Sequence, residues 1–535
     1  MTQLETDPQK TAQRLSDLDE SERNHLFSRL QERMPAVWDA RRTLTESIRL
    51  GLEDESVVVV PSVTLDPAVP GSGSLSQAYE ERFLFLLLLL RQPWLRMIYI
   101  TSMPIKPSIV EYYLALLPGV IPSHAMARLN LLSVGDSSPR PLSAKLLDRP
   151  RMLSKIAAMI PNRQRCHLIP YSTTALERDI ALTLGIPMYG ADPRLAELGS
   201  KTGCRRLFAE EGVQHPLGAE DLHSFEDVTD AIMKMLAERP SIDEVIVKLN
   251  EGVSGAGNAL VDLRGIADTA GSDRRSEVAQ RVRSMRLESP ITPMAAYEAK
   301  FEQNGGVVEE RIVGVELLSP SVQLRVRPDR SVELLSTHDQ LLGGTSGQSY
   351  LGCIFPADPA YSRLISTPAM TVGERLATEG ALGRFAVDFV VKRDAAGRWS
   401  AYAIELNLRK GGTTHPFLTL QFLTDGSYDG ASGRFLLPGG EQRHLVATDH
   451  LESSELRALA VEDLFDIVAR HGLHFDQSRQ TGVVFHMISS LTEHGRIGLT
   501  AVGPSPEEAM RIYEDAQQVL FAEAAAAREQ MRLPE

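Results

Sequence analysis

The sequence predicts a multidomain protein that opens with an α/β sheet and continues with α+β structure. At 535 residues the chain is too long for a single hydrophobic core and should divide into several domains. Over residues 56–196, short apolar runs alternate with helical patterns, which indicates an open α/β sheet. Over residues 197–419, paired strand patterns joined by short turns indicate hairpins.

The α/β part contains four strand patterns and three helical ones. We expect strands at 57–60, 97–101, 129–134 and 167–171, and helices at 79–90, 151–160 and 174–184. Before them, residues 1–55 read as an N-terminal helical segment, with one helix beginning near Ser21.

The remainder of the chain reads as two further domains. In 197–419 we expect helices at 201–212 and 224–237, a hairpin around 250–258, strands at 307–318 and 321–336, and a hairpin over 384–407. Residues 420–535 form a smaller mixed domain, whose last helix begins at Ser505 with a capping box.

Composition excludes several classes of protein. The formal charge of -14 disfavours binding to nucleic acid or to an anionic membrane. The longest apolar run, 83–90, is far shorter than the roughly 20 residues that span a bilayer. Three scattered cysteines and a polar, acidic N-terminus without a signal-peptide pattern predict a cytoplasmic protein.

Residues 244–263 combine a strand, a glycine-rich loop and a second strand. Small residues let backbone N–H groups approach phosphate oxygens, and Lys248 on the flanking strand supplies a positive charge. The sequence has neither the Gly-Lys-Ser/Thr end of a P-loop nor a helix after the glycines. An ordinary hairpin turn remains the alternative. The candidate phosphate-binding residues are Lys248, Glu251, Gly252, Ser254, Gly255 and Gly257.

The hairpin over 384–407 carries three oxygen ligands. With a turn of even length, Asp388 and Glu405 fall on one face, and Asn407 joins them two residues later. Carboxylates together with phosphate oxygens and water suit Mg²⁺. The alternative is a solvent-facing polar surface, which the apolar neighbours and the following Arg-Lys-Gly-Gly-Thr-Thr-His run disfavour.

Residues 309–316 resemble the nucleotide hinge of ATP-grasp enzymes such as D-alanine:D-alanine ligase. The resemblance implies that Glu309, Glu310 and Ile312 meet the adenine and that Glu316 meets the ribose. It also makes Lys201 and Lys248 the two nucleotide-binding lysines and Asp388, Glu405 and Asn407 the metal ligands.

These motifs follow the order found in the family. The segments RQPWLRMIYITSMPIKPSIVEYYL and ELNLRKGGTTHP resemble peptide ligases of the pheganomycin-biosynthesis type. That resemblance implies an ATP-grasp fold preceded by an open α/β pre-ATP-grasp domain, with ATP and Mg²⁺ as cofactors and a possible homodimer.

One departure concerns the arginine that steadies the acyl phosphate. D-alanine ligases have an arginine two residues before the metal-binding aspartate, where this chain has Ala386. Arg409 is the first candidate to replace it and Arg325 the second. Three histidines are candidates for positioning a substrate. His415 is the best of them, ahead of His338 and His486, because it lies in the loop after the metal ligands.

The function implied is an ADP-forming carboxylate-amine ligase that works through an acyl phosphate. Its substrates would be a small carboxylate and an amine or peptide acceptor. Two alternatives stay open: a non-catalytic ATP-binding scaffold, and a ligase that takes ammonia or a small amine.

Overall fold

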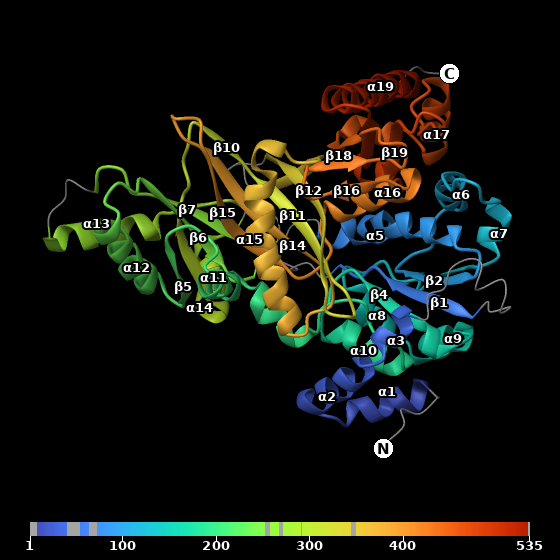
Figure 1. Ribbon diagram of the computed structural model, residues 1–535, viewed down its shortest axis with the longest axis horizontal. Coiled ribbons are helices and arrows are strands. Elements are labelled where there is room, and N and C mark those ends of the chain that lie inside the picture. The colour runs from blue at the N-terminus through green and yellow to red at the C-terminus, as the bar shows by residue number, and fades with distance from the viewer. Residues whose placement is uncertain are drawn as a thin grey trace.

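The computed structural model describes residues 8–39, 54–63, 72–251, 257–266, 271–289, 292–343 and 349–532. Within them the chain forms four sheets surrounded by helices (Figure 1). No helix of these segments is both long enough and apolar enough to cross a membrane.

The first sheet is parallel, as its apolar strands predict. It consists of β1 (Glu55–Val60), β2 (Leu95–Thr101), β3 (Leu129–Ser133) and β4 (Cys166–Pro170), in the order β3-β2-β1-β4. Val57 and Tyr99 face one hydrophobic core, whereas Val58 and Ile98 face another. Because both faces are covered, these strands are apolar at consecutive positions.

Helices cover both faces of this sheet (Figure 1). The face of Val57 carries α5 (Ser72–Arg82), the 3-10 helix η1 (Phe83–Arg91), α6 (Pro107–Ala115) and α7 (Pro122–Met126). The face of Val58 carries α8 (Leu142–Leu147), α9 (Pro150–Met159) and α10 (Ala175–Leu184). The N-terminal helices α1 (Pro8–Ser16) and α2 (Glu20–Gln31) pack on that same face, and α3 (Met34–Asp39) follows them.

Two local predictions differ from the structure here. The single helix expected over 79–90 changes from α to 3-10 winding at Phe83. The 3-10 segment packs against β2, α6 and α16 (Thr414–Thr424). A 3-10 helix has three residues per turn, so its side chains form three rows, and each row can face one of these three elements. The helix expected near Ser21 starts at Glu20, because Asp19 forms a capping box with Glu22.

The second sheet is antiparallel, with the order β5-β9-β6-β7-β8. Its strands are β5 (Gly218–Leu222), β6 (Glu244–Leu249), β7 (Asn258–Asp262), β8 (Arg286–Leu287) and β9 (Gly306–Glu310). The helices of this part are α11 (Lys201–Glu210), α12 (Phe225–Glu238), α13 (Gly271–Arg283) and α14 (Met294–Asn304). The expected hairpin around 250–258 is present, since β6 pairs with β7 and Lys248 lies opposite Asn258.

The strand expected over 307–318 is divided between two sheets. β9 ends at Glu310, and β10 (Glu316–Leu318) pairs with a strand of the third sheet. Residues 311–315 therefore form a connection between the two sheets, which is where the sequence suggested a hinge.

The third sheet has nine strands and joins two predicted domains. Its strands are β10, β11 (Pro320–Val326), β12 (Val332–Gly343), β13 (Ser349–Phe355), β14 (Gly383–Arg393), β15 (Trp399–Asn407), β18 (His444–Glu452), β19 (Gly482–His486) and β20 (Arg496–Gly503). The helix α15 (Pro359–Thr378) packs on β11, β12 and β15. Because β13 pairs with β18, the sheet runs across the predicted boundary at residue 420.

The C-terminal part closes over the first sheet (Figure 1). Its remaining elements are β16 (Ser427–Asp429), β17 (Arg434–Leu436), α17 (Val461–Arg470), α18 (Ser490–His494) and α19 (Pro506–Arg532). At the start of α19, Ser505 Oγ accepts the Glu508 N–H at 3.2 Å, as the predicted cap requires. Leu499 and Val57 belong to one hydrophobic core, and this part packs on the helices that cover the parallel sheet, since α16 contacts η1 and Tyr113 Oη of α6 donates to Phe485 O at 3.2 Å.

Candidate active site

A cavity of about 550 Å³ lies where the three large sheets approach one another. The second sheet contributes Lys248 and Glu309, and the third contributes Asp388 and Glu405. The parallel part and the C-terminal part close its other end with Arg82 and residues of β18 and β20. The cavity thus brings together residues that lie far apart in the sequence.

Glu309 holds Lys248 in place at one wall of the cavity. Its two carboxylate oxygens accept from Lys248 Nζ at 2.5 Å and from Arg205 Nη1 at 2.7 Å. Burial opposes the ionisation of Glu309, but the two cations outweigh it and lower the pKa of the carboxyl. The Lys248 ammonium is therefore fixed at a defined point of the cavity wall.

The connection between the sheets forms an apolar slot beside this pair. Glu310 and Ile312 line it, and the Glu310 N–H donates to Leu217 O at 2.8 Å. The apolar walls are Ile246, Ile312, Leu317, Phe389 and Ile404. A flat apolar group such as a purine ring fits between walls of this kind.

The structure does not bring Glu316 into the lining of the cavity. Its carboxylate pairs with Arg393 Nη2 at 2.6 Å, at the point where β10 joins β14. In this structure the Glu316 side chain bridges two strands, and the ribose contact expected for it stays a prediction.

The three predicted metal ligands converge on the cavity. Asp388 lies directly opposite Glu405 in the β14–β15 hairpin, and Asn407 lies opposite Ala386. Asn407 Nδ2 and Gln340 Nε2 each donate to Asp388, both at 3.0 Å. The register shift that produces this arrangement lies between Asp388 and Phe389.

That register shift compensates for the length of the turn. The connecting residues 394–398 are odd in number, so a regular ladder would set Asp388 opposite Ile404. A bulge at Ile404 moves Glu405 opposite Asp388 and turns Ile404 and Glu405 together toward the cavity. Asp388 and Glu405 thus lie on one face, as predicted, but because of a bulge and not because of a turn of even length.

The electrostatics of this hairpin suit a divalent cation. Burial and the neighbouring charge of Glu405 raise the pKa of Asp388 to about 6. Burial also opposes the ionisation of Glu405, but the ion pair with Lys201 lowers its pKa. Two half-buried carboxylates and an amide on one face form the oxygen donor set that Mg²⁺ prefers, and a bound cation would relieve the repulsion between the carboxylates.

Lys201 reaches the hairpin from the first turn of α11. Ser200 Oγ caps that helix by accepting the Gly203 N–H at 2.9 Å. Asn250 Oδ1 accepts from the Thr202 N–H and hydroxyl, at 3.0 and 2.7 Å, and so ties α11 to the end of β6. Both predicted lysines therefore line one cavity.

The glycine-rich loop is described only at its ends. Gly257 lines the cavity and its carbonyl accepts from Tyr297 Oη at 3.1 Å, whereas Glu251 is exposed. Gly252, Ser254 and Gly255 lie outside the described residues.

Arg409 lines the cavity beyond the metal-ligand hairpin. Its charge favours the ionised forms of Asp388 and Glu405, and its Nη1 donates to Lys410 O at 3.1 Å. The following loop, 411–413, also lines the cavity, and Thr414 Oγ1 ties it to Gln323 Oε1 at 3.0 Å.

The other candidate arginine, Arg325, lies outside the cavity. Although it is on β11 with Ser321, which lines the cavity, Arg325 pairs with Glu333 at 2.5 Å. Its guanidinium also lies 5.6 Å from the ring centre of Trp38. The structure therefore removes Arg325 from the candidates for a contact with substrate.

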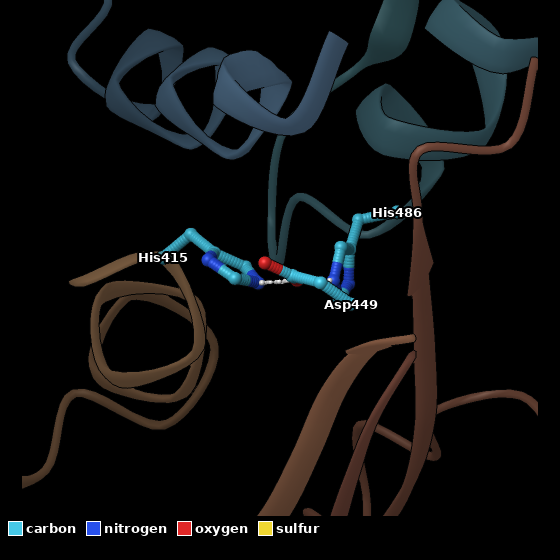
Figure 2. A group of neighbouring side chains, drawn as sticks. All are labelled: His415, Asp449 and His486. Atoms are coloured by element: carbon cyan, nitrogen blue, oxygen red, sulfur yellow. Dashed lines mark hydrogen bonds and ion pairs between the residues drawn. The ribbon is translucent and has the colours of Figure 1, made fainter. Parts of the chain in front are cut away.

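His415 is likewise not among the residues that line the cavity, and its ring lies beside Asp449 and His486 (Figure 2). Its Nε2 lies 3.0 Å from His486 Nε2 and 3.4 Å from Asp449 Oδ1, and His486 Nε2 lies 2.7 Å from the same oxygen. Burial and the neighbouring His486 hold the pKa of His415 well below its usual value, so the ring is neutral. The structure thus places His415 against Asp449 and away from the cavity lining, which disfavours the direct contact with substrate expected for it.

These three side chains are of types that also bind metal ions, and the ligand atoms lie within 4.8 Å of one another. Asp449 is already committed on its other oxygen, which pairs with Arg82. The contacts are at hydrogen-bond distance, so the group forms a buried polar network that reaches the cavity through Asp449.

Several residues of the cavity were not identified from the sequence. Besides Gln340, they lie at the end formed by the parallel and C-terminal parts: Tyr79, Arg82, Tyr171, Tyr350, Asp449, His450 and Arg496. One signal was present, because Thr448, Asp449 and His450 interrupt the apolar pattern of the strand over 445–451. The others come from elements whose contact only the fold establishes.

Comparisons with known proteins agree with this geometry. Residues 193–290 and 292–431 match a family described as IQCH-like, ATP-grasp, and residues 463–516 match one described as PGM1 C-terminal domain. An L-propargylglycine--L-glutamate ligase of Streptantibioticus cattleyicolor is 30% identical over 454 residues, which cover 82% of this chain and 89% of that protein.

Two further matches extend the comparison. IQ motif-containing protein H of Danio rerio is 24% identical over 448 residues, which cover 75% of this chain but only 42% of that protein. Among solved structures, a biotin carboxylase from Campylobacter jejuni superposes with a TM-score of 0.52 at 12% identity, covering 88% of this chain and 95% of that one. At 12% identity, the match to the biotin carboxylase shows a similar fold and nothing about activity.

Proposed function

Because the chain belongs to the ATP-grasp family of ligases, we propose that it joins a carboxylate to an amine through an acyl phosphate, with amino acids as substrates. The similar ligase named for L-propargylglycine and L-glutamate makes that pair the first to test. The proposal fits an enzyme that uses ATP and Mg²⁺, as ATP-grasp homologues do.

The observation that carries the proposal is the convergence of two lysines and three oxygen ligands on one cavity. Lys201 and Lys248 supply positive charge for phosphates, and Asp388, Glu405 and Asn407 supply the ligands for Mg²⁺. A scaffold that only binds nucleotide has no need of paired carboxylates facing its phosphates. The arrangement therefore supports catalysis.

In the proposed reaction, a carboxylate oxygen of the substrate attacks the γ-phosphorus and ADP leaves. The amine then attacks the acyl carbon, and phosphate departs with that oxygen. Mg²⁺ bound at the hairpin would neutralise the phosphate oxygens during transfer. The chain itself supplies position and charge, with no nucleophile of its own.

Arg409 is proposed to stabilise the charge that develops on the transferred phosphoryl group and then on the tetrahedral carbon. It lines the cavity next to the metal-ligand hairpin, whereas Arg325 does not. This assigns to Arg409 the role of the arginine that related ligases carry at the position of Ala386.

The test is a screen for ATP-dependent phosphate release. Pairs of the twenty proteinogenic amino acids, L-propargylglycine and ammonia are incubated with ATP and Mg²⁺, and products are identified by mass spectrometry. Release of ADP that requires both an acid and an amine supports the ligase. Tight ATP binding with no turnover across the panel contradicts it and favours the scaffold, and amide products from ammonia alone favour a small-amine ligase.

A variant of one metal ligand checks the site itself. Glu405→Gln removes a charged ligand while keeping its shape, so we expect at least a roughly hundredfold loss of kcat with the fold unchanged. Glu374→Gln, on the exposed side of α15, is the matched control and should retain activity. Full activity of Glu405→Gln with Mg²⁺ would show that the metal assignment is wrong.

A further inference from the structure

Two buried arginines meet at the end of the cavity opposite the apolar slot. Arg82 is the last residue of α5 and Arg496 is the first of β20, so the pair exists only in the folded chain. Their exposed fractions are 4% and 6%, and both line the cavity. The proposed nucleotide and metal site uses neither of them.

Each arginine is anchored by part of its guanidinium. Arg82 pairs through Nη1 with Asp449, and its Nη2 donates to Tyr171 Oη at 3.2 Å. Arg496 Nε donates to the backbone carbonyl of Asp449 at 2.7 Å. These contacts fix the planes of both guanidinium groups relative to Asp449.

Each arginine also keeps a nitrogen that has no hydrogen-bond partner among the residues the structure describes. These nitrogens are Arg82 Nε and Arg496 Nη2, and both are buried. His450 Nδ1, on the same wall, is a third such atom. A buried polar atom without a hydrogen-bond partner is costly, so these three nitrogen atoms favour a polar group in the adjoining cavity.

The charges at this end favour an anion. Asp449 is the one buried carboxylate that the described residues place against the arginines; its side chain pairs with Arg82, whereas Arg496 donates to its backbone carbonyl. Its oxygens are engaged by Arg82 and by the histidines His415 and His486 (Figure 2). Glu452 approaches Arg496 only at 3.8 Å and is itself 58% exposed. Among the described residues, Arg496 thus has only this distant and exposed carboxylate as an ion-pair partner.

The surroundings suit a small organic acid. The Arg82 guanidinium lies 4.8 Å from the ring centre of Tyr79 and 5.6 Å from that of Tyr171. Val63 and Leu75 add apolar surface to the same cavity. A carboxylate between two guanidinium groups, with a side chain against aromatic rings, matches this lining.

The loop that follows the metal ligands connects this end to the reaction centre. Arg409 acts on the charges of Asp388 and Glu405, and Gly412 lies against Tyr350, where a Cβ would come within 2.5 Å of the ring. Tyr350, Asp449 and Arg82 all line the same cavity. A bound amino acid could therefore reach from the arginines toward the transferred phosphoryl group.

We propose that Arg82 and Arg496 form a carboxylate subsite that holds the non-reacting carboxylate of an amino acid substrate. This inference rests on the proposed ligase function, because it names the class of its substrate. Phosphate groups of the nucleotide are served by Lys201, Lys248 and Arg409 at the other end, which leaves the arginine pair for the amino acid.

The first test changes the substrate. With ADP saturating, the midpoint of thermal unfolding is measured with each of the twenty proteinogenic L-amino acids and with the α-amides of those that raise it. We expect the acids to raise the midpoint and the amides to have no effect. For pairs that are turned over, we expect a roughly hundredfold or greater fall in kcat/KM for the α-amide of one substrate.

The second test changes the subsite. In Arg496→Gln and Arg82→Lys, the preference for acid over amide should shrink to within about tenfold, while ADP affinity stays within about twofold. Arg470→Gln, an exposed arginine of α17, is the matched control and should keep the full preference. Bound ADP and a cooperative unfolding transition verify that each variant is folded.

The outcomes separate this inference from the ligase proposal. If no amino acid raises the unfolding midpoint, or if the amides act as well as the acids, the subsite is overturned. The subsite is also overturned if both variants keep the preference. Binding that depends on the arginines without any turnover would uphold the subsite and contradict the ligase.

Discussion

Glu309 shows at the scale of one residue how the cavity wall is built. A carboxylate that is 3% exposed remains ionised because Lys248 and Arg205 each occupy one of its oxygens. The arrangement orients a lysine that would otherwise be flexible. It also leaves a negative charge close to any phosphate that Lys248 binds.

That balance predicts the behaviour of two variants. Lys248→Met should raise the Kd for ADP by tenfold or more, because a phosphate contact is lost and Glu309 loses one of its cations. Adding Glu309→Gln should recover part of the affinity for ADP, since the repulsion between the Glu309 carboxylate and the phosphates of ADP is removed. Calorimetric titration of the single and double variants measures the coupling, and strictly additive effects would contradict the ion pair.

His338 predicts the acid sensitivity of the fold. Its ring is completely buried, lies 3.1 Å from Gln323 Nε2, and has its pKa lowered from 6.5 to about 3 by burial. The unfolded chain therefore binds more protons than the folded chain between these values. The contribution of His338 to the free energy of unfolding is therefore fully present above pH 6.5 and is lost as the pH falls below that value.

A substitution measures this contribution. At pH 5, protonation of His338 in the unfolded chain should lower the free energy of unfolding by about 2 kcal/mol relative to pH 7.5. In His338→Gln, the difference in the free energy of unfolding between pH 7.5 and pH 5 should be smaller by that amount, as measured by urea unfolding at the two pH values. An equal fall in the variant would assign the acid sensitivity to other groups.

The sequence predicted the residues of the nucleotide and metal end much better than those of the other end. Lys201, Lys248, Asp388, Glu405 and Arg409 carry charges in local patterns, and all five line the cavity. Arg82 and Arg496 stand in patterns that look structural, since one follows a helix and the other starts a strand. Their meeting depends on contacts between parts of the chain more than 400 residues apart.

At the scale of elements, two local irregularities govern the site. The bulge at Ile404 sets Glu405 opposite Asp388, and the break between β9 and β10 forms the apolar slot. Neither irregularity is encoded by hydrophobic periodicity, which gives the strands but not the residues that depart from the ladder. The sequence therefore predicted the β14–β15 hairpin and the strand over 307–318, and missed the bulge in the first and the change of sheet in the second.

The loop after β15 offers a prediction at this scale. A Cβ at Gly412 would lie 2.5 Å from the Tyr350 ring, whereas a Cβ at Gly411 would meet nothing within 4 Å. Gly412→Ala should therefore displace the loop and lower kcat by about tenfold or more, with little change in ADP affinity. Gly411→Ala is the control and should remain close to wild type.

A second substitution tests the cause of that loss. Tyr350→Leu shortens the side chain that the new Cβ would meet, so in the double variant we expect part of the Gly412→Ala loss to be recovered. Steady-state kinetics of the three variants provide the comparison. A loss that is identical with and without the Tyr350 substitution would contradict the steric explanation.

At the scale of the whole molecule, the C-terminal part is an integral part of the fold. β18 extends the third sheet from β13, and Leu445, Leu499 and Val57 share one hydrophobic core. The boundary predicted at residue 420 therefore divides a continuous sheet, although the fold is the ATP-grasp fold that the motifs indicated. The other predicted boundaries stay predictions.

This continuity predicts the effect of truncation. A chain that ends at residue 442 loses β18, β19 and β20 and exposes the edge of β13, so it should aggregate and bind no ADP. A chain that ends at residue 528 is the control and should bind ADP normally. Soluble, ADP-binding protein from the shorter chain would show that residues 420–535 fold as a separate domain.

The central claim is that this chain activates a carboxylate by phosphorylating it, and oxygen transfer tests that claim most directly. The carboxylate substrate is labelled with ¹⁸O, and the phosphate released with the amide product is analysed by mass spectrometry. Attack of the carboxylate on the γ-phosphorus predicts that the label enters inorganic phosphate. Unlabelled phosphate, or label found in AMP, would contradict the acyl phosphate mechanism.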